Sequence, residues 1–394
     1  MKHLGIVSDA HHYRDVHGRL CTLTPLARQF EQWATLFDRV TVLAPLLAGS
    51  PPSAFGPYAS RNIDLQAVPL AGGNNLRGKL GLLPALQKWW REIRRLLGTV
   101  DAVHIRSPNN VGIPALLAVA GTRVFRQAAF TGTWPGYEDE PMTYKWQRWY
   151  LARRFAGPVA VYGQWPQQPS HIVPSFSPSF SESEWEVEHD IVSRKVARLR
   201  SFTTLLSPIS LVTIGSLNKN QDVVIRVVKE LADRGVEARL EVLGGGPQQE
   251  NLENLVRLLG LERQVRLHGR VSHVVVRDHL RSADFAVQAP TVEGFGKVPI
   301  EAFLHGAIPI LSDVNLSRQL VGEGMRGRCF PLGDQSSAAT AVMDLRRCPG
   351  EMAHMVELGR IYSRDLTLER WRLHLKEMLE QHWKVRFCPN AEAL

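Results

Sequence analysis

The order of apolar and polar positions predicts a chain in which short buried strands alternate with amphipathic helices. In the first half, a helical spacing of apolar residues covers 25–37. Runs rich in Val, Ile, Leu and Ala predict the strands 4–8, 39–45, 101–106, 127–132 and 157–163. Alternation of this kind is typical of a parallel sheet with helices on both faces.

The alternation stops at 166–186, a segment rich in Pro and Ser that is typical of a connector between domains. It resumes with helical patterns at 221–235 and 251–261 and with the predicted strands 210–216, 238–246, 264–269, 283–289 and 307–313. The fold class is therefore α/β, with two doubly wound domains in tandem. We expect residues 1–190 to form the first domain with its connector, 191–365 the second, and 366–394 a helix that packs back on the first.

Composition excludes disordered and fibrous proteins, since 44% of the 394 residues are hydrophobic and 22% are charged. No run of about 18 apolar residues occurs and the first residues do not resemble a signal peptide, so we expect a cytoplasmic protein. The four cysteines lie far apart and indicate neither a zinc site nor a disulfide framework. The net charge of +9 favours an anionic partner, either nucleic acid, an acidic membrane surface or a phosphorylated small molecule.

Two glycine-bearing turns are candidates for binding phosphate. Gly215 ends a predicted strand, where a ligand can approach the backbone, and Lys219 brings a charge to the start of the next helix. The stretch LGGGPQQE also follows a strand and opens a helix. A turn without a ligand and a solvated lysine are the alternatives.

The most informative segment is APTVEGFGKVPIEAFLHGAIPILSD, residues 289–313. We expect a loop at the carboxyl edge of the sheet and a helix with Pro299 at its first position, which puts Glu301 at about the third. A carboxylate there could simply cap the helix. Glu293 precedes the loop and is expected to face a ligand. Two carboxylates around a glycine loop can hold sugar hydroxyls while the helix start and Lys219 hold a diphosphate, which describes a nucleotide-sugar site.

Across 212–334 the chain resembles the donor-binding domain of the retaining GT-B glycosyltransferases of group 1, or family 4, which includes bacterial polysaccharide, glycolipid and lipopolysaccharide transferases. Glu293 and Glu301, separated by seven residues, match the signature of that family. The other matching segments, in order, are IGSLNKNQDVVI, ARLEVLGGGPQQENL, VRLHGRVSH and GRCFPLGD. The resemblance implies two Rossmann-like domains that face each other across a cleft.

The resemblance also implies roles for individual residues. Glu301 would bind the ribose hydroxyls, Glu293 would face the donor sugar and the reaction centre, and Lys219 would neutralise phosphate charge. The remaining donor contacts would be Gly215 and Ser216, the backbone near Arg270 and Val271 at the base, and the loop Gly294, Phe295, Gly296 and Lys297 over the sugar and the diphosphate. No cofactor and no metal are implied, because in this family lysine or arginine and a helix dipole do the work of a cation. The leaving phosphate would help to deprotonate the acceptor hydroxyl, so no separate general base is implied.

The sequence departs from the family pattern in three places. Ser216 stands where the family usually has an arginine, so half of the usual phosphate clamp is missing. Only Gly18 is available for the glycine pair after the first strand, and Thr133 stands where a histidine is common. With His104, which we expect near a strand end by the cleft, Gly18 and Thr133 are candidates for acceptor contact.

Two segments of the first half, 86–97 and 144–155, interleave aromatic and basic residues. Such amphipathic helices bind anionic membrane surfaces, so residues 86–97 are a candidate for membrane attachment. The residues concerned are Lys88, Trp89, Trp90, Arg91, Arg94 and Arg95. In the alternative, the tryptophans belong to the core and the charges are solvated. We expect no nucleic acid partner, because no recognition motif accompanies this composition.

Three functions fit the sequence. The first is a retaining, metal-independent glycosyltransferase that uses a nucleotide sugar and a saccharide or lipid-linked acceptor. The second is a non-catalytic protein that binds nucleotide sugars, which the missing arginine at Ser216 favours. The third is a nucleotide-sugar epimerase on the same fold.

Overall fold

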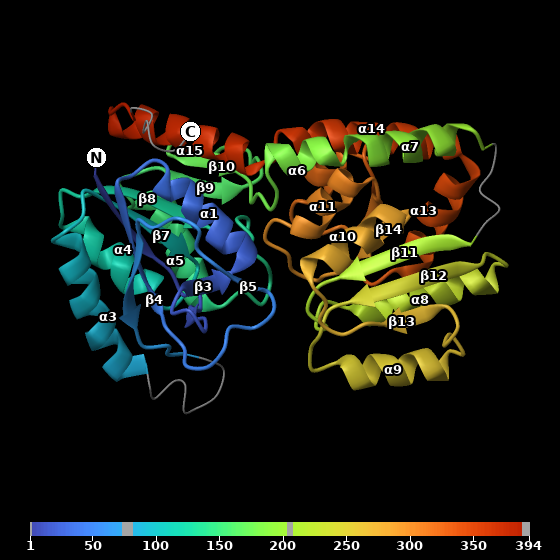
Figure 1. Cartoon of the computed structure of the whole chain (residues 1–394), viewed down its shortest axis with the longest axis horizontal. Helices are drawn as coiled ribbons and strands as arrows, with labels where there is room; N and C mark the ends of the chain where they lie inside the picture. Colours follow the sequence, from blue (N-terminus) through green and yellow to red (C-terminus); the bar gives the residue numbers. More distant parts are fainter. Residues whose placement is uncertain (1, 73–81, 203–207, 388–394) are drawn as a thin grey trace. The chain divides into compact units, whose positions relative to one another are not determined.

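The computed structural model describes residues 2–72, 82–202 and 208–387. They form two compact units (Figure 1), of which the first contains the chain up to Pro178 and again from Leu368, and the second contains Ser179–Thr367. The expected boundary at residue 190 is wrong, because it lies inside helix α7 (His189–Arg200), which packs within the second unit.

The first unit contains a parallel sheet of seven strands in the order β10-β9-β8-β7-β1-β4-β6. These strands are β1 (His3–Val7), β4 (Arg39–Pro45), β6 (Ile63–Val68), β7 (Ala102–Ser107), β8 (Phe125–Phe130), β9 (Val159–Tyr162) and β10 (Ile172–Ser175). A small antiparallel sheet contains β2 (Tyr13–Arg14), β3 (Leu20–Leu23) and β5 (Phe55–Pro57). The helices are α1 (Thr24–Ala34), α3 (Leu82–Leu97), α4 (Gly112–Ala120), α5 (Met142–Arg153) and α15 (Leu368–Trp383).

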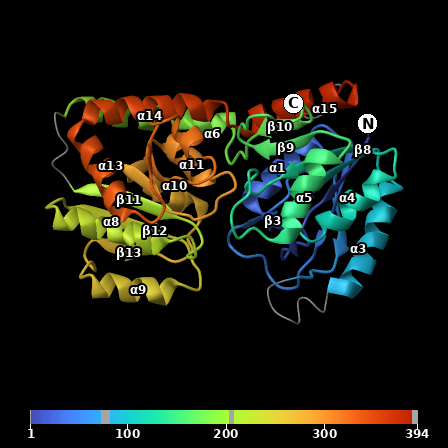
Figure 2. The same ribbon diagram turned by 180° about the vertical axis from the view of Figure 1, so that it is seen from behind.

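Helices cover both faces of this sheet, as the apolar pattern predicts (Figures 1 and 2). On one face, α1 and α15 bury Phe30, Trp33 and Leu379 against the strands. On the other face, α3, α4 and α5 bury Ile93 and Leu151. The C-terminal helix is therefore part of the core of the first unit.

Trp89 belongs to this core and not to a membrane-binding face. It is 2% exposed, and its indole N–H donates a hydrogen bond to the carbonyl of Pro69 at 2.9 Å. The expectation that both neighbouring tryptophans lie on one exposed face is wrong, because adjacent residues of a helix point in directions about 100° apart. Trp90 is 43% exposed. The basic residues Lys88, Arg91, Arg94 and Arg95 are also exposed.

The second unit contains a parallel sheet of six strands in the order β13-β12-β11-β14-β15-β16. The strands are β11 (Ile209–Ile214), β12 (Ala238–Leu243), β13 (Val265–Leu267), β14 (Phe285–Gln288), β15 (Ile308–Ser312) and β16 (Arg328–Phe330). Besides α7, the helices are α6 (Glu182–Val187), α8 (Gln221–Asp233), α9 (Gln249–Leu258), α10 (His273–Ser282), α11 (Lys297–His305), α12 (Ser317–Val321), α13 (Gln335–Arg347) and α14 (Pro349–Arg364).

Every strand predicted from the sequence is present, within a few residues at its ends. In the two parallel sheets, β6, β10 and β16 were not predicted, and neither were the strands β2, β3 and β5 of the small sheet. Among the described residues β10 pairs only with β9, so it is an edge strand. Pro174 is tolerated there, because one side of an edge strand needs no hydrogen-bond partner. The expected connector therefore contains the last strand of the first sheet.

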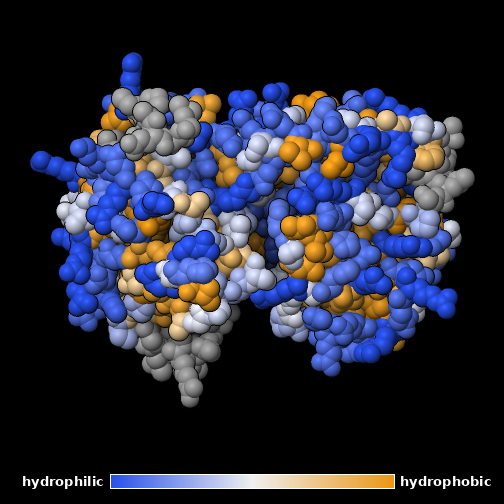
Figure 3. Space-filling model, in the orientation of Figure 1, coloured by the Kyte–Doolittle hydropathy of each residue, from blue (hydrophilic) through white to orange (hydrophobic). Residues whose placement is uncertain are grey.

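No helix in the described ranges is long and apolar enough to cross a bilayer. On the face drawn in Figure 3, hydrophobic residues form small separate patches among hydrophilic ones. Single exposed apolar residues of this kind are normal on proteins in water.

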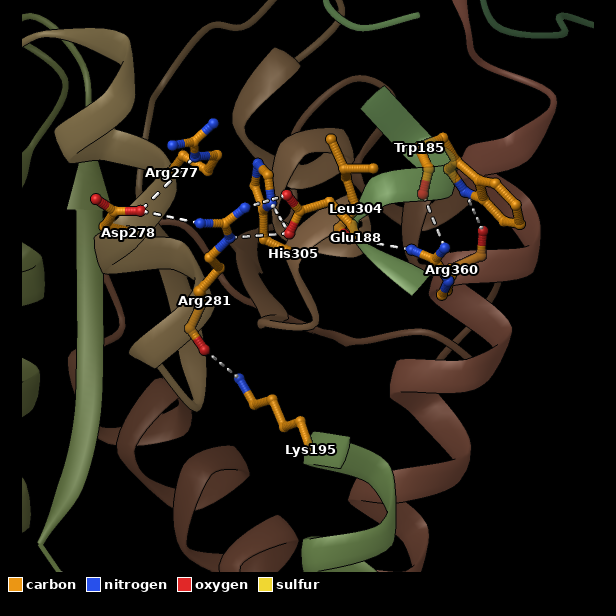
Figure 4. A network of polar contacts seen from close by, with 9 residues as sticks. All are labelled: Trp185, Glu188, Lys195, Arg277, Asp278, Arg281, Leu304, His305 and Arg360. Carbon is orange, nitrogen blue, oxygen red and sulfur yellow. Dashed lines mark hydrogen bonds and ion pairs between the residues drawn. The ribbon is translucent and has the colours of Figure 1, made fainter. Parts of the chain in front are cut away.

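A buried ion cluster joins α7 to α10 and α11 (Figure 4). The carboxylate of Glu188, a residue that is only 3% exposed, accepts a hydrogen bond from Arg281 Nε at 3.0 Å and lies 3.0 Å from His305 Nδ1. Burial alone would raise the pKa of Glu188, but the hydrogen bonds from His305 and Arg281 outweigh it and lower the pKa to about 2. Glu188 is therefore charged at neutral pH and holds the C-terminal end of α11.

Trp185 joins α6 to α14 beside this cluster. The guanidinium of Arg360 lies over the Trp185 ring, 4.1 Å from its centroid, and donates to the Trp185 carbonyl at 2.8 Å. These contacts explain why α6 and α7 belong to the second unit.

We predict that Glu188→Gln lowers the free energy of unfolding by about 3–5 kcal/mol at neutral pH, the range for breaking a buried ion pair. The pKa of Glu188 falls on folding from 4.5 to about 2, so the native protein should lose this stabilisation as the pH falls from 4.5 towards 2. Urea unfolding of both proteins at neutral pH and at pH 3 checks this, and the difference between them should be smaller at pH 3.

The matched control is Glu357→Gln, which removes the exposed partner of Arg200 at 2.7 Å. An exposed pair of this kind contributes less than about 1 kcal/mol. Equal losses for the two variants, or a difference that does not change with pH, would contradict the role given to Glu188.

Candidate functional site

The candidate site lies where the strand order of the second sheet reverses, between β11 and β14. These strands pair in parallel, with Leu211 beside Phe285 and Val212 beside Ala286. From β11 the chain continues towards β12 and β13, whereas from β14 it continues towards β15 and β16. Ligands of such sheets bind outside the carboxyl ends of the strands at this point.

The loop after β11 packs closely against the loop after β12. Gly215 has φ +142° and donates its N–H to the carbonyl of Leu243 at 2.9 Å. A Cβ atom on Gly244 would lie 1.8 Å from the carbonyl oxygen of Gly215, so glycine is required there. The predicted phosphate turns therefore form one continuous surface of backbone.

Gln221, which the sequence interpretation missed, shapes the turn that carries Lys219. Its side chain is 3% exposed, donates to the carbonyl of Ser216 at 2.9 Å and accepts from the N–H of Lys219 at 3.0 Å. Asn220, with φ +57°, lets α8 begin directly after this turn. Ser216 itself is exposed.

Lys219 and Glu293 meet across the reversal point. The Lys219 Nζ lies 2.6 Å from Glu293 Oε2, and the two side chains are 38% and 30% exposed. The second carboxylate oxygen of Glu293 accepts from the N–H of Gly294 at 3.1 Å. The structure thus brings together the two residues for which the sequence predicts a catalytic role.

The loop after β14 is held from behind by Asn315, a second residue that sequence reasoning missed. Its amide group donates to the carbonyls of Glu293 at 2.7 Å and Gly294 at 2.6 Å. Phe295 is buried, and Gly296 has φ +78° at the N-cap of α11. Gly296 supplies no side chain to the first-turn amide groups, and a helix start of this kind favours a bound anion.

The position of Glu301 differs from the prediction. Because α11 begins at Lys297, Pro299 is its third residue and Glu301 is its fifth. Glu301 therefore lies beyond the first turn and cannot be explained as a helix cap. It is 9% exposed, its nearest recorded partner is His273 Nε2 at 3.9 Å, and its carboxylate accepts no hydrogen bond in the described part of the chain.

The segment after β13 reaches the same group of loops. The Gly244 N–H donates to the carbonyl of Gly269 at 2.8 Å. The side chain of Arg270 lies across Gly245, where an added Cβ atom would come within 2.7 Å of Arg270 Cγ. Val271 is partly buried against the apolar cluster of α10 and β12. Arg270 therefore adjoins the turn after β12, and the contact of Arg270 and Val271 with the base stays a prediction.

The candidate residues of the first unit are less well grouped. His104 was expected near a strand end by the cleft, and this is wrong because it lies within β7, 3% exposed and 4.8 Å from the ring of Trp33. Burial lowers the pKa of His104 to about 3. Gly18 forms the turn between β2 and β3 with φ +76°, and Thr133 is buried in the loop after β8.

Asp9 and Asn109 mark the reversal point of the first sheet, between β1 and β7. The Asn109 amide donates to Asp9 Oδ1 at 3.3 Å and to the carbonyl of Arg106 at 2.7 Å. Asn109 Oδ1 also accepts the N–H of Gly112 at the start of α4, at 2.6 Å. The signal in the sequence was a polar residue close after each of two predicted strands, since Asp9 directly follows 4–8 and Asn109 comes three residues after 101–106.

Comparisons with known proteins point to one family. Residues 208–361 match the family model of glycosyl transferases group 1. The chain is 29% identical over 191 residues to 2-deoxystreptamine N-acetyl-D-glucosaminyltransferase of Niallia circulans, covering 48% of this chain and 44% of that protein. It is 30% identical over 183 residues to GDP-mannose-dependent alpha-(1-6)-phosphatidylinositol monomannoside mannosyltransferase of Mycolicibacterium smegmatis, covering 45% of this chain and 44% of that one.

These alignments span less than half the length of each relative. The structure of sucrose-phosphate synthase from Thermosynechococcus elongatus covers 98% of this chain and 100% of its own, with a TM-score of 0.72 and 14% identity, so both domains share its fold. The matched residues 208–361 contain Lys219, Glu293 and Glu301. Residues 208–361 are therefore similar to the glycosyl transferases group 1, and the two Rossmann-like domains have the GT-B fold.

Proposed function

We propose that the protein is a retaining, metal-independent glycosyltransferase that moves a sugar from a nucleotide-diphosphate donor to a hydroxyl acceptor in polysaccharide, glycolipid or lipopolysaccharide biosynthesis. The observation that carries the proposal is the contact of Lys219 Nζ with Glu293 Oε2 at 2.6 Å. Glu293 lies in the loop that leads into α11, the helix that holds Glu301. The two relatives support the proposal, since one is named as an N-acetyl-D-glucosaminyltransferase for 2-deoxystreptamine and the other as a GDP-mannose-dependent mannosyltransferase for a phosphatidylinositol mannoside.

Glu301 is suited to bind the ribose of the donor. A carboxylate that is mostly buried normally accepts several hydrogen bonds, and this one accepts none in the described residues. Two neighbouring hydroxyl groups can supply the missing donors as a bidentate pair. A ligand with a vicinal diol therefore completes the site.

Lys219 and the start of α11 are suited to bind the diphosphate. When phosphate oxygens approach Lys219, they replace Glu293 as its partner, and the carboxylate of Glu293 is released towards the sugar. Lys219 then stabilises the negative charge that develops on the leaving phosphate. That phosphate accepts the proton of the acceptor hydroxyl as the sugar–phosphate bond breaks and the glycosidic bond forms on the same face of the sugar, so no separate base is needed. Lys219 and the start of α11 take the place of a metal ion at the diphosphate.

The alternative functions differ in what they do to a nucleotide sugar. A binding protein, which the exposed Ser216 favours, would hold the donor without turnover. An epimerase would change the sugar and leave it attached to the nucleotide. Transfer or slow hydrolysis of the sugar supports the proposed function.

We predict that the protein releases a free nucleoside diphosphate from at least one donor in a panel of UDP-, GDP- and ADP-sugars. The rate of this release should persist in excess EDTA. Mass spectrometry of nucleotide and sugar products distinguishes transfer, isomerisation and binding alone. Loss of turnover in EDTA, with recovery on addition of Mn²⁺ or Mg²⁺, would show that the metal-independent mechanism is wrong.

We predict that Glu301→Gln weakens nucleotide diphosphate binding by about 1–3 kcal/mol, the range for a hydrogen bond to a charged group. Calorimetric titration measures this loss, and thermal unfolding checks that the fold is kept. Glu262→Gln is the matched control, because Glu262 is an exposed carboxylate after the C-terminal end of α9 in the same unit. An affinity equal to that of the control would overturn the ribose assignment.

We also propose that the exposed face of α3 binds anionic membranes. The exposed residues of this face are Lys88, Trp90, Arg91, Arg94 and Arg95. Each lysine or arginine near an anionic surface contributes about 1 kcal/mol to the free energy of binding. Glu92, 13% exposed, lies 3.3 Å from Arg91 and 3.8 Å from Arg95 and offsets part of this charge. The buried Trp89 takes no part, so attachment depends on charge more than on apolar insertion.

Changing Arg91, Arg94 and Arg95 together to Ser should release the protein from phosphatidylserine liposomes at low salt. Binding of the unchanged protein should fall as salt rises, because charges are screened beyond about 8–10 Å at physiological strength. The control changes three exposed arginines of α7, Arg194, Arg198 and Arg200, to Ser. Equal loss in both triple variants, or no binding by the unchanged protein, would contradict a specific membrane face.

A further inference from the structure

Three side chains that ligate metals converge in the second unit, away from Lys219, Glu293 and Glu301. Glu241 lies on β12, His268 directly follows β13, and His279 lies on α10. One ligand atom of each lies within 4.8 Å of the others. The spacing of these residues in the sequence matches no metal motif, and the prediction of no metal site rested on such spacing.

The contacts within this cluster leave one imidazole without a hydrogen-bonding role. Glu241 Oε2 and His268 Nε2 are hydrogen-bonded to each other, and these side chains are 28% and 21% exposed. The rings of His268 and His279 lie with their centroids 4.9 Å apart. In the described part of the chain, the His279 side chain makes no hydrogen bond, so a ring nitrogen can act as a ligand.

The surroundings make this arrangement unusual. The neighbouring packing is apolar, since Leu243 at the end of β12 belongs to one buried cluster with Leu280 and Ala283 at the end of α10. A polar side chain at such an interface destabilises the fold unless it has a partner. A bound cation would satisfy the carboxylate and both imidazoles together.

We propose that Glu241, His268 and His279 bind one Zn²⁺ ion, with water at a fourth position. Two imidazoles and one carboxylate are a ligand set that Zn²⁺ takes in proteins. Ca²⁺ and Mg²⁺ prefer oxygen ligands throughout, which excludes them here. The site lies beyond the proposed transferase function and does not depend on it.

Binding requires only a small adjustment. Zn²⁺ holds nitrogen at about 2.0–2.1 Å in a tetrahedral arrangement, which places ligand atoms roughly 3.4 Å apart. Glu241 Oε2 and His268 Nε2 lie closer together than this and move apart by about 1 Å to admit the ion. The partly exposed His279 ring, whose ligand atom lies within 4.8 Å of theirs, rotates towards it. The ion would then tie α10 to β12 and to the segment that leads into Arg270.

The test uses the full chain without a purification tag, stripped of metal and titrated with Zn²⁺ against a chromophoric chelator. We expect one ion per chain, a melting temperature that rises with Zn²⁺, and a visible absorption band when Co²⁺ is substituted. His268→Asn and His279→Asn should each weaken Zn²⁺ binding at least about tenfold, since even the loss of a group that only supports a ligand costs that much.

Two controls separate this site from other places where Zn²⁺ binds. His354→Asn removes an exposed histidine of α14, and Cys348→Ser removes an exposed thiol, and neither change should alter the affinity. If His268→Asn does not fold, His279→Asn decides, because it leaves the Glu241–His268 pair intact. No retained Zn²⁺, or retention that Cys348→Ser removes and His279→Asn does not, would overturn the proposal.

Discussion

The parallel pairing of β11 with β14 is the constraint on which the donor side of this protein depends. Each strand needs a neighbour for its backbone groups, and parallel neighbours leave their carboxyl ends on the same edge. The turn that carries Lys219 and the loop that carries Glu293 are therefore adjacent, although they come from distant parts of the sequence. The contact between Lys219 and Glu293 therefore follows from the pairing of β11 with β14.

Helix α11 is fixed at both ends, which matters because Glu301 lies in its middle. At its start, Asn315 holds the preceding loop through two carbonyl groups. At its end, His305 contacts the buried carboxylate of Glu188 at 3.0 Å. A site built on a helix held in this way keeps its geometry better than a site on loops alone.

Much of this fold was predictable because fully buried parallel strands are continuous apolar runs. The strand β10 was missed because Pro and Ser surround it. A proline such as Pro174 argues against a strand unless the strand is known to lie at the edge of the sheet. The helical position of Glu301 was misjudged because Pro299 suits a first position, whereas the positive φ of Gly296 starts the helix earlier. Asn315 and Glu188 could not be found from the sequence, since only the folded chain brings them to α11.

The return of the chain to the first unit at Leu368 has a consequence for how the protein is made. Met378, Leu379 and Trp383 of α15 complete the apolar core around Trp33 of α1. During synthesis the ribosome releases the second unit before α15, so the first unit stays open on one face while the second unit, which is continuous in sequence, can already fold. Until α15 emerges, the nascent chain displays a large apolar surface and is exposed to chaperones and to aggregation.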